Sequence, residues 1–122
     1  MSKELFLKQN KNAGETYAGI ILGERDYHVF LIAGQTAGNW QRCMDWAASA
    51  GGLLPNKREQ SLLIANCREE FGPNWYWSNT QNADATDCAW MQNFYSGRQS
   101  NYRKLYEYSA RAVRILYVGD EK

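Results

Sequence analysis

Hydrophobic periodicity changes twice along the chain, and these changes restrict the fold more than any other feature. Residues 15–22 and 27–32 are apolar and β-branched, with the turn-forming segment 23–26 between them, which predicts an antiparallel hairpin. Between residues 40 and 67 apolar side chains recur at helical spacing, and after residue 73 alternation with period two returns. Strands, then helices, then strands indicate an α+β fold built on an antiparallel sheet.

Two short helices are predicted in the middle of the chain. Trp40, Cys43 and Ala47 share one helical face, which predicts a helix over residues 40–50. The segment Asn56-Lys-Arg-Glu59 has the pattern of a capping box and predicts the start of a second helix. Helices of this length are marginal in isolation, so we expect both to pack beside the sheet.

Length and charge exclude several classes of protein. The 122 residues fit one domain, with a core from about residue 15 to residue 118. Fourteen basic and 13 acidic side chains give a net charge of +1, so no overall field attracts nucleic acid or an anionic membrane. No apolar run approaches the roughly 20 residues of a membrane span. We therefore expect neither a nucleic-acid partner nor a membrane partner.

The N-terminal residues and the cysteines indicate a cellular location. The first eight residues carry charges on both sides of three apolar positions, which is unlike a signal peptide. Cys43, Cys67 and Cys88 are odd in number, widely spaced and free of any Cys-x-x-Cys pair, which favours reduced thiols. These observations predict a cytoplasmic or virion-associated protein without a signal peptide.

The segment from Asn74 to Tyr102 has a composition of its own. It contains only three charged side chains and is rich in Trp, Tyr, Asn, Gln and Ser. Tyrosine supplies a large contact area at low entropic cost, while Ser and Asn supply adaptable hydrogen bonds. This composition is therefore typical of a recognition surface.

Alternation assigns the side chains of this segment to two faces of the predicted strands. Trp90 and Phe94 share one face and are expected in the core, together with Trp75 and Trp77. The tryptophans would then support a rigid platform on which tyrosines are free to contact a ligand. Exposure is expected for Asn93, Tyr95, Ser100, Tyr102 and Tyr106.

Catalytic motifs are weak or absent in the sequence. His28 is the only histidine, and a lone histidine in a strand is more often packed or solvated than catalytic. Asp84 and Asp87 lie three residues apart in a polar loop, which makes them a weak candidate for Ca²⁺ and more simply solvated turn residues. We expect no enzyme, no cofactor and no resident metal.

Basic residues gather late in the chain and have two interpretations. Arg103, Lys104, Arg111 and Arg114 are compatible with a patch for nucleic acid or a sulfated sugar. The other interpretation is a ladder of arginines that stack on Trp and Tyr faces of a sheet. It is favoured because Glu107 lies among these basic residues and the aromatic side chains nearby are tyrosines.

Several segments follow one another in an order that resembles a known family. They are the helix of residues 40–50, Leu54-Pro55-Asn56 with Glu59, Tyr76-Trp77-Ser78-Asn79, Ala89-Trp90, Phe94 with Gly97, and Arg111-Ala-Val-Arg114. This order resembles the C-type-lectin-like domain at the C-terminus of bacterial collagen-like adhesins, which also occurs in phage and prophage proteins and in variable proteins of diversity-generating retroelements. The resemblance covers roughly residues 15–116. Asn79 and Ala112 depart from the pattern, which has Ser and, in many members, Cys at these positions.

The resemblance implies a C-type-lectin-like fold with two short helices and a displayed β-face in the hairpin after Trp90. In the retroelement-diversified relatives this late segment carries the variable positions. By position, the ligand-binding residues it implies are Met91, Asn93, Tyr95, Gln99, Ser100, Tyr102, Arg103 and Tyr106.

Composition and resemblance together predict a non-catalytic receptor-recognition domain, encoded by a phage or prophage, that binds a protein or a glycan. The alternative is an intracellular phage effector that binds and inhibits a host protein. A third hypothesis is an enzyme, because formylglycine-generating oxidases have a distantly related architecture, but their close pair of cysteines has no counterpart in this sequence. Homo-oligomer formation stays open.

Overall fold

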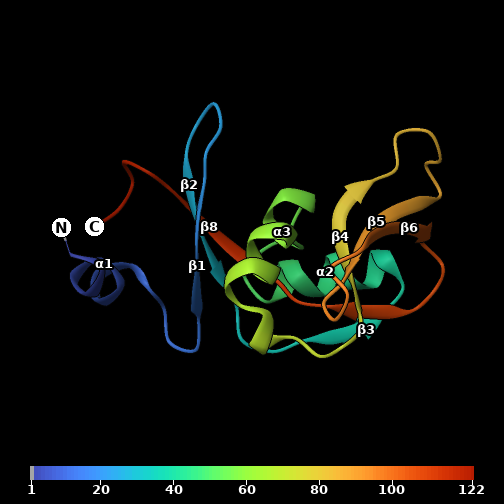
Figure 1. The fold of residues 1–122 in the computed structure, drawn as a ribbon, viewed down its shortest axis with the longest axis horizontal. Helices are drawn as coiled ribbons and strands as arrows, with labels where there is room; N and C mark the ends of the chain where they lie inside the picture. The colour runs from blue at the N-terminus through green and yellow to red at the C-terminus, as the bar shows by residue number, and fades with distance from the viewer. Residues whose placement is uncertain (1) are drawn as a thin grey trace.

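The computed structural model describes residues 2–122 and combines helices with two separate sheets (Figure 1). None of the helices in this range is both long and apolar enough to cross a membrane. In chain order the elements are α1 (Lys3–Asn10), β1 (Thr16–Ile21), β2 (Tyr27–Leu31), β3 (Thr36–Gly38), α2 (Trp40–Ser49), α3 (Lys57–Asn66), the 3₁₀ turn η1 (Arg68–Glu70), β4 (Trp75–Gln81), β5 (Cys88–Asn93), β6 (Gln99–Arg103), β7 (Tyr108–Ala110) and β8 (Val113–Tyr117).

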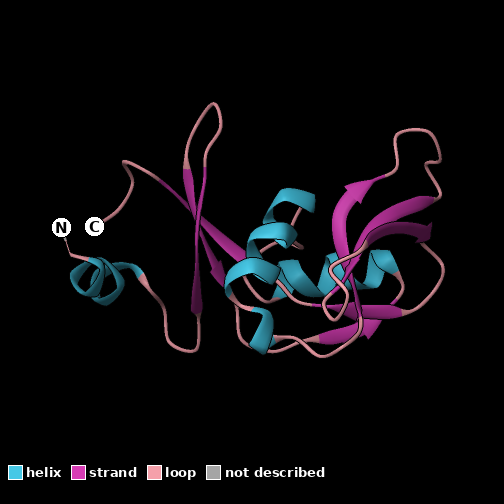
Figure 2. Cartoon of the chain, in the orientation of Figure 1, coloured by secondary structure: helices cyan, strands magenta, loops and turns pink. Residues whose placement is uncertain are grey.

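The strands divide between a three-stranded and a five-stranded sheet (Figure 2). The first sheet has the order β1-β2-β8 and is antiparallel throughout, and it contains the predicted hairpin. The second has the order β3-β7-β4-β5-β6, and its β4 and β7 run parallel. The predicted α+β class is therefore confirmed, but the prediction of a single antiparallel sheet is wrong. The chain crosses from β6, at one edge, to β7 on the far side of β4, and this crossover creates the parallel pair.

A third helix, α1, precedes the predicted core. The Ser2 side chain caps it by accepting a hydrogen bond from the backbone N–H of Leu5. The ring of Phe6 lies 4.4 Å from the ring of His28 in β2, and the backbone N–H of Lys122 donates to the side chain of Asn10. The C-terminal end of the chain therefore lies beside α1 (Figure 1). The sequence pattern missed this helix because tertiary contacts, and not a strong apolar face, hold it in place.

The two predicted helices are confirmed at their starts. Asn39 caps α2 by accepting from the backbone N–H of Arg42. Asn56 and Glu59 form the complete reciprocal capping box of α3. Helix α3 contacts β1 of the first sheet as well as β4 and β5 of the second, so it joins the two sheets.

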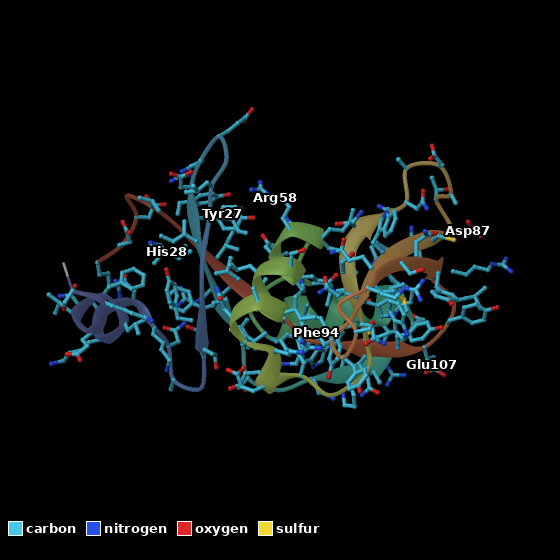
Figure 3. The ribbon with its side chains drawn as sticks, in the orientation of Figure 1. Tyr27, His28, Arg58, Asp87, Phe94 and Glu107 are labelled. Atoms are coloured by element: carbon cyan, nitrogen blue, oxygen red, sulfur yellow. The ribbon has the colours of Figure 1, made fainter. Side chains whose placement is uncertain are left out.

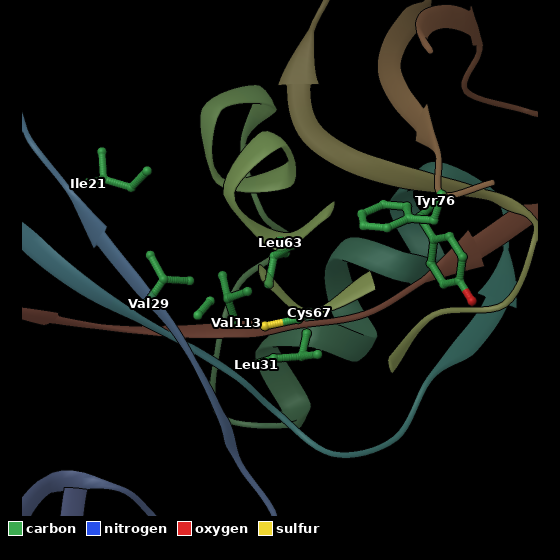
Figure 4. Close-up of a cluster of buried hydrophobic side chains, with 9 residues drawn as sticks. Ile21, Val29, Leu31, Leu63, Cys67, Tyr76 and Val113 are labelled. Atoms are coloured by element: carbon green, nitrogen blue, oxygen red, sulfur yellow. The ribbon is translucent and has the colours of Figure 1, made fainter. Parts of the chain in front are cut away.

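Two clusters of buried apolar side chains form the core. The first contains Val29, Leu63 and Val113 and lies between the first sheet and α3 (Figure 4). The second contains Trp77 and Met91 and lies between the five-stranded sheet and α2. Helix α2 therefore packs on the second sheet and α3 on both sheets, and burial in these clusters supplies the tertiary support that short helices need.

The segment that follows α2 hydrogen-bonds to β8 and so connects α2 to the first sheet. Leu53 exchanges backbone hydrogen bonds with Val113 at the start of β8. Gly52 lies so close to that strand that a Cβ atom would stand 2.3 Å from the carbonyl oxygen of Val113. Glycine is required at this position because two backbones meet there.

Candidate ligand-binding surface

The hairpin of β5 and β6 carries most of the residues implied by the resemblance. Its register pairs Ala89 with Tyr102 and Met91 with Ser100. The amide oxygen of Asn93 accepts hydrogen bonds from the backbone N–H groups of Tyr95 and Ser96, which closes the predicted turn. A turn stabilised in this way holds the two strands in a fixed register.

Both faces of β5 are covered, and this overturns one expected site residue. Met91 is fully buried in the cluster that contains Trp77, so the expectation that it contacts a ligand is wrong. On the opposite face Gln92 and Phe94 are buried as well. The sequence pattern assumed one covered face, whereas α2 packs on one side of this sheet and α3 on the other.

The tryptophans are only partly the internal supports that the sequence predicted. Trp77 is fully buried, and its indole N–H donates to the carbonyl oxygen of Gly38. Trp90 is half-buried, and the ammonium of Lys57 lies 3.5 Å from its ring centroid at the start of α3. Trp75 is also half-buried. The core position expected for Trp77 is confirmed, that of Trp75 is confirmed in part because it packs against the second cluster, and that of Trp90 is wrong.

Three rings form a continuous group at the surface of the second sheet, which we call the aromatic cluster: Trp75, Tyr102 and Tyr108. The ring centroids of Trp75 and Tyr102 are 6.5 Å apart, and those of Tyr102 and Tyr108 are 5.8 Å apart. Tyr108 in turn contacts the buried ring of Trp77 at 5.5 Å. The exposed fraction of Tyr102 is 43%. The cluster is thus anchored in the core at one end and open to solvent at the other.

A surface pocket of about 530 Å³ adjoins the aromatic cluster. Trp75 and Tyr108 contribute its aromatic wall, and Asn74, Asn93 and Glu107 contribute polar groups. Pockets that hold ligands combine aromatic walls with a few polar groups in this way. Figure 3 shows Glu107 at the end of the molecule opposite His28.

The other tyrosines of the predicted site are exposed but lie apart from the pocket. Tyr95 stands in the β5–β6 turn and is 73% exposed. Tyr106 lies in the loop before β7 and is 46% exposed. Their predicted exposure is confirmed. Tyr95 and Tyr102 mark opposite ends of β6, so a single small ligand would not contact both.

The remaining predicted residues face structural neighbours. The Gln99 amide donates to the carbonyl oxygen of Lys57 and to the side chain of Gln92. Ser100 is half-buried opposite Met91. Arg103 is exposed and lies 3.5 Å from Asp87. Gln99 is half-buried and stabilises the contact between β6 and α3, and its contact with a ligand stays a prediction.

The polar loop before β5 offers no built metal site. Asn82 accepts a hydrogen bond from the backbone N–H of Asp84, and Asp87 pairs with Arg103. Across residues 2–122 no group of three or more His, Cys, Asp and Glu side chains is arranged to hold a metal ion.

The late basic residues do not form one patch. Arg111 is buried, and its guanidinium donates to the carbonyl oxygens of Glu70 and Ile32. Arg114 pairs with Glu15 at 2.7 Å and lies 4.4 Å from the ring centroid of Phe30. Stacking on aromatic side chains is therefore the correct interpretation for Arg114, and the basic patch is wrong.

A second and larger pocket, of about 710 Å³, lies under α1 at the other end of the molecule. His28 is buried there, with its Nε2 2.7 Å from Glu121 and its Nδ1 2.8 Å from the Tyr17 hydroxyl. Because a carboxylate only accepts, Nε2 carries a proton, and Nδ1 is the hydrogen-bond partner of the Tyr17 hydroxyl. Burial, reinforced by the charge of Glu121, raises the pKa of Tyr17. The prediction of a packed histidine is confirmed.

The cysteines lie in three different places. Cys43 and Cys67 are fully buried, one in each apolar cluster, and Cys88 begins β5. All three are free thiols. Burial raises the pKa of Cys43 and that of Cys67 to about 11. Two of the thiols are thus poor nucleophiles at neutral pH.

The sequence interpretation missed three residues of this surface: Trp75, Tyr108 and Glu107. Trp75 was assigned to the core because tryptophan in an alternating run is usually buried. Tyr108 and Glu107 follow the segment of unusual composition, and only the crossover to β7 brings them beside Trp75. No sequence signal marked that crossover.

Comparison with models of known protein families finds no match for this chain, and comparison with curated proteins finds none either.

Proposed function

We propose that the chain is a non-catalytic ligand-binding domain of the C-type-lectin-like kind that presents the aromatic cluster to a protein or glycan. The observation that carries the proposal is the exposed, core-anchored group of Trp75, Tyr102 and Tyr108 beside a polar pocket. Fixed aromatic side chains bind with little loss of conformational entropy, because they are already ordered before the ligand arrives.

The order of elements supports the lectin-like assignment. Two successive helices, α2 and α3, separate an N-terminal hairpin from the late strands, and the last strand, β8, returns to pair with β2. The resemblance implies the same arrangement of two short helices followed by a displayed β-face. It also favours a phage or prophage setting, which detection of the protein in purified virions or in host cytosol would test.

Binding to a glycan array and to purified host surface proteins tests the function. We expect a ligand whose binding falls at least about tenfold in Tyr102→Ala, since loss of a central aromatic contact typically costs more than 1 kcal/mol. Tyr117→Ala is the matched control, because Tyr117 is a half-buried ring of the first sheet that contacts Tyr27 and Arg25.

The exposed tyrosines refine the footprint of the ligand. Tyr95→Ala weakens binding only if the ligand extends along the whole of β6, and Tyr106→Ala only if it reaches the loop before β7. Equal binding by the wild type and Tyr102→Ala would contradict the proposed surface. Complete absence of a ligand among glycans and host proteins would contradict the function.

A further inference from the structure

We propose that the pocket beside the aromatic cluster receives a cationic side chain, lysine or arginine, of a protein partner. This inference rests on the proposed binding function and names the chemistry that the surface recognises. The pocket lies between Trp75 and Tyr108, with Glu107 in its lining.

The walls of the pocket suit an organic cation. The faces of tryptophan and tyrosine carry negative charge density and attract ammonium and guanidinium groups within about 6 Å of the ring. Within the same protein, Lys57 lies over Trp90 and Arg25 over Tyr117. Trp75 and Tyr108, in contrast, have no cation over them among the described residues. A cationic side chain of a partner would place a positive charge over these rings, as Lys57 and Arg25 do over Trp90 and Tyr117.

The charge of the pocket favours the same ligand. Glu107 is the only charged side chain in the lining, and it takes part in none of the ion pairs among residues 2–122. The nearest basic residues in the sequence are engaged elsewhere. Arg103 pairs with Asp87, and Lys104 contacts Gln81 and Thr86.

The free carboxylate also discriminates between classes of ligand. A sulfated or otherwise anionic glycan would be repelled by Glu107. A neutral sugar can donate hydroxyl hydrogen bonds to the carboxylate, but it supplies no opposite charge to pair with Glu107. A lysine or arginine side chain supplies the charge for Glu107 and an apolar stem for the rings. Protein is therefore the class of partner that the pocket fits.

Small amides of single amino acids test the inference directly on the wild-type chain. The probes are the Nα-acetyl methylamides of lysine, arginine and, as the uncharged control, norleucine. Two-dimensional NMR detects binding through the Trp75 indole N–H, assigned with Trp75→Phe, and through the backbone of Tyr108 and Ser109. We expect concentration-dependent shifts at these groups with both cationic probes and none with norleucine.

Two substitutions sharpen the test. Glu107→Gln is expected to weaken binding of the lysine and arginine probes about three- to fivefold, the size of an exposed ion pair. Glu24→Gln, an exposed glutamate between β1 and β2, is the matched control and should leave binding unchanged. Trp75→Phe should weaken binding about twofold, because the phenyl ring attracts cations less than indole.

The outcomes separate this inference from the proposed function. Equal shifts with norleucine, or equal binding by Glu107→Gln and wild type, would overturn the cationic ligand. A glycan whose binding depends on Tyr102 while the cationic probes cause no shift would overturn the inference and leave the binding function standing. Probe binding that depends on Glu107, without any glycan ligand, supports the inference.

Discussion

The two sheets differ in what their polar and aromatic side chains contact. In the first sheet Arg114 donates to both carboxylate oxygens of Glu15, and the imidazole of His28 is hydrogen-bonded at both nitrogens. In the second sheet the rings of Trp75 and Tyr102 contact each other, Trp75 is half-buried and Tyr102 is exposed. Polar groups are thus internally paired in one sheet, and aromatic surface is left open in the other.

The contrast separates residues that stabilise the fold from residues that are available to bind a ligand. A buried charge or hydroxyl needs a partner, because its desolvation is otherwise uncompensated. A half-exposed aromatic ring needs no hydrogen-bond partner inside the protein, so it is available to contact a ligand. We therefore expect substitutions in the first sheet to lower stability and substitutions in the aromatic cluster to lower binding.

The largest expected effect is the loss of the partner of Glu15. Arg114→Met should lower the free energy of unfolding by about 3 kcal/mol, because the Glu15 carboxylate stays buried without its cation. Urea unfolding followed by circular dichroism measures the loss. Arg25→Met is the matched control, since the ion pair of Arg25 with Asp120 is exposed and its removal should cost less than about 1 kcal/mol. Equal losses in the two variants would contradict the comparison.

A smaller effect is expected at the buried histidine. His28→Leu should lower the free energy of unfolding by about 2 kcal/mol, because the Tyr17 hydroxyl and the Glu121 carboxylate each lose a hydrogen-bond partner. In the double variant Tyr17→Phe/His28→Leu no hydroxyl remains unpaired, so the two losses should be less than additive. Strict additivity would show that the hydrogen bond contributes nothing.

Acid should remove part of the stability of the first sheet. Burial acts to raise the pKa of Glu15, but hydrogen bonds from Arg114 and Asn12 outweigh it, so the pKa lies below its ordinary value of 4.5. A carboxylate with a lowered folded-state pKa stabilises the fold fully above about pH 4.5 and loses this contribution as pH falls through that pKa. The stability difference between wild type and Glu15→Gln should therefore shrink below pH 4.5. A constant difference down to pH 3 would contradict the assignment.

The smallest effects on stability are expected in the second sheet. Tyr95→Ala should change the free energy of unfolding by less than about 0.5 kcal/mol, and Tyr102→Ala by less than about 1 kcal/mol. Thermal unfolding of both variants beside the wild type measures this. A loss at Tyr102 as large as that in Arg114→Met would show that the ring supports the fold and is not held for a ligand.

Local patterns in the sequence were sufficient for the helices. The pairing of Asn56 with Glu59 depends on residues three positions apart, and the structure contains it as predicted. The helical spacing of Trp40, Cys43 and Ala47 likewise placed all three in the core. Such features depend on near neighbours in the chain, so a single sequence contains the information that they need.

The late strands were harder to interpret because alternation defines two faces and does not say what covers each. Met91 was expected at the surface and Trp90 in the core, whereas Met91 is buried under α2 and Trp90 is half-buried beside Lys57. The number of covered faces depends on where both helices pack. That is a long-range property, which spacing within one strand does not contain.

Sequence patterns were enough to predict the α+β class, the two capped helices, the turn after β5 and the exposure of Tyr95, Tyr102 and Tyr106. Only the packed fold shows that the strands form two sheets and that Trp75, Glu107 and Tyr108 line one pocket beside the β4–β7 pair. This is because caps, turns and periodic patterns depend on interactions within a few residues, whereas a pocket forms only where packing brings distant segments together.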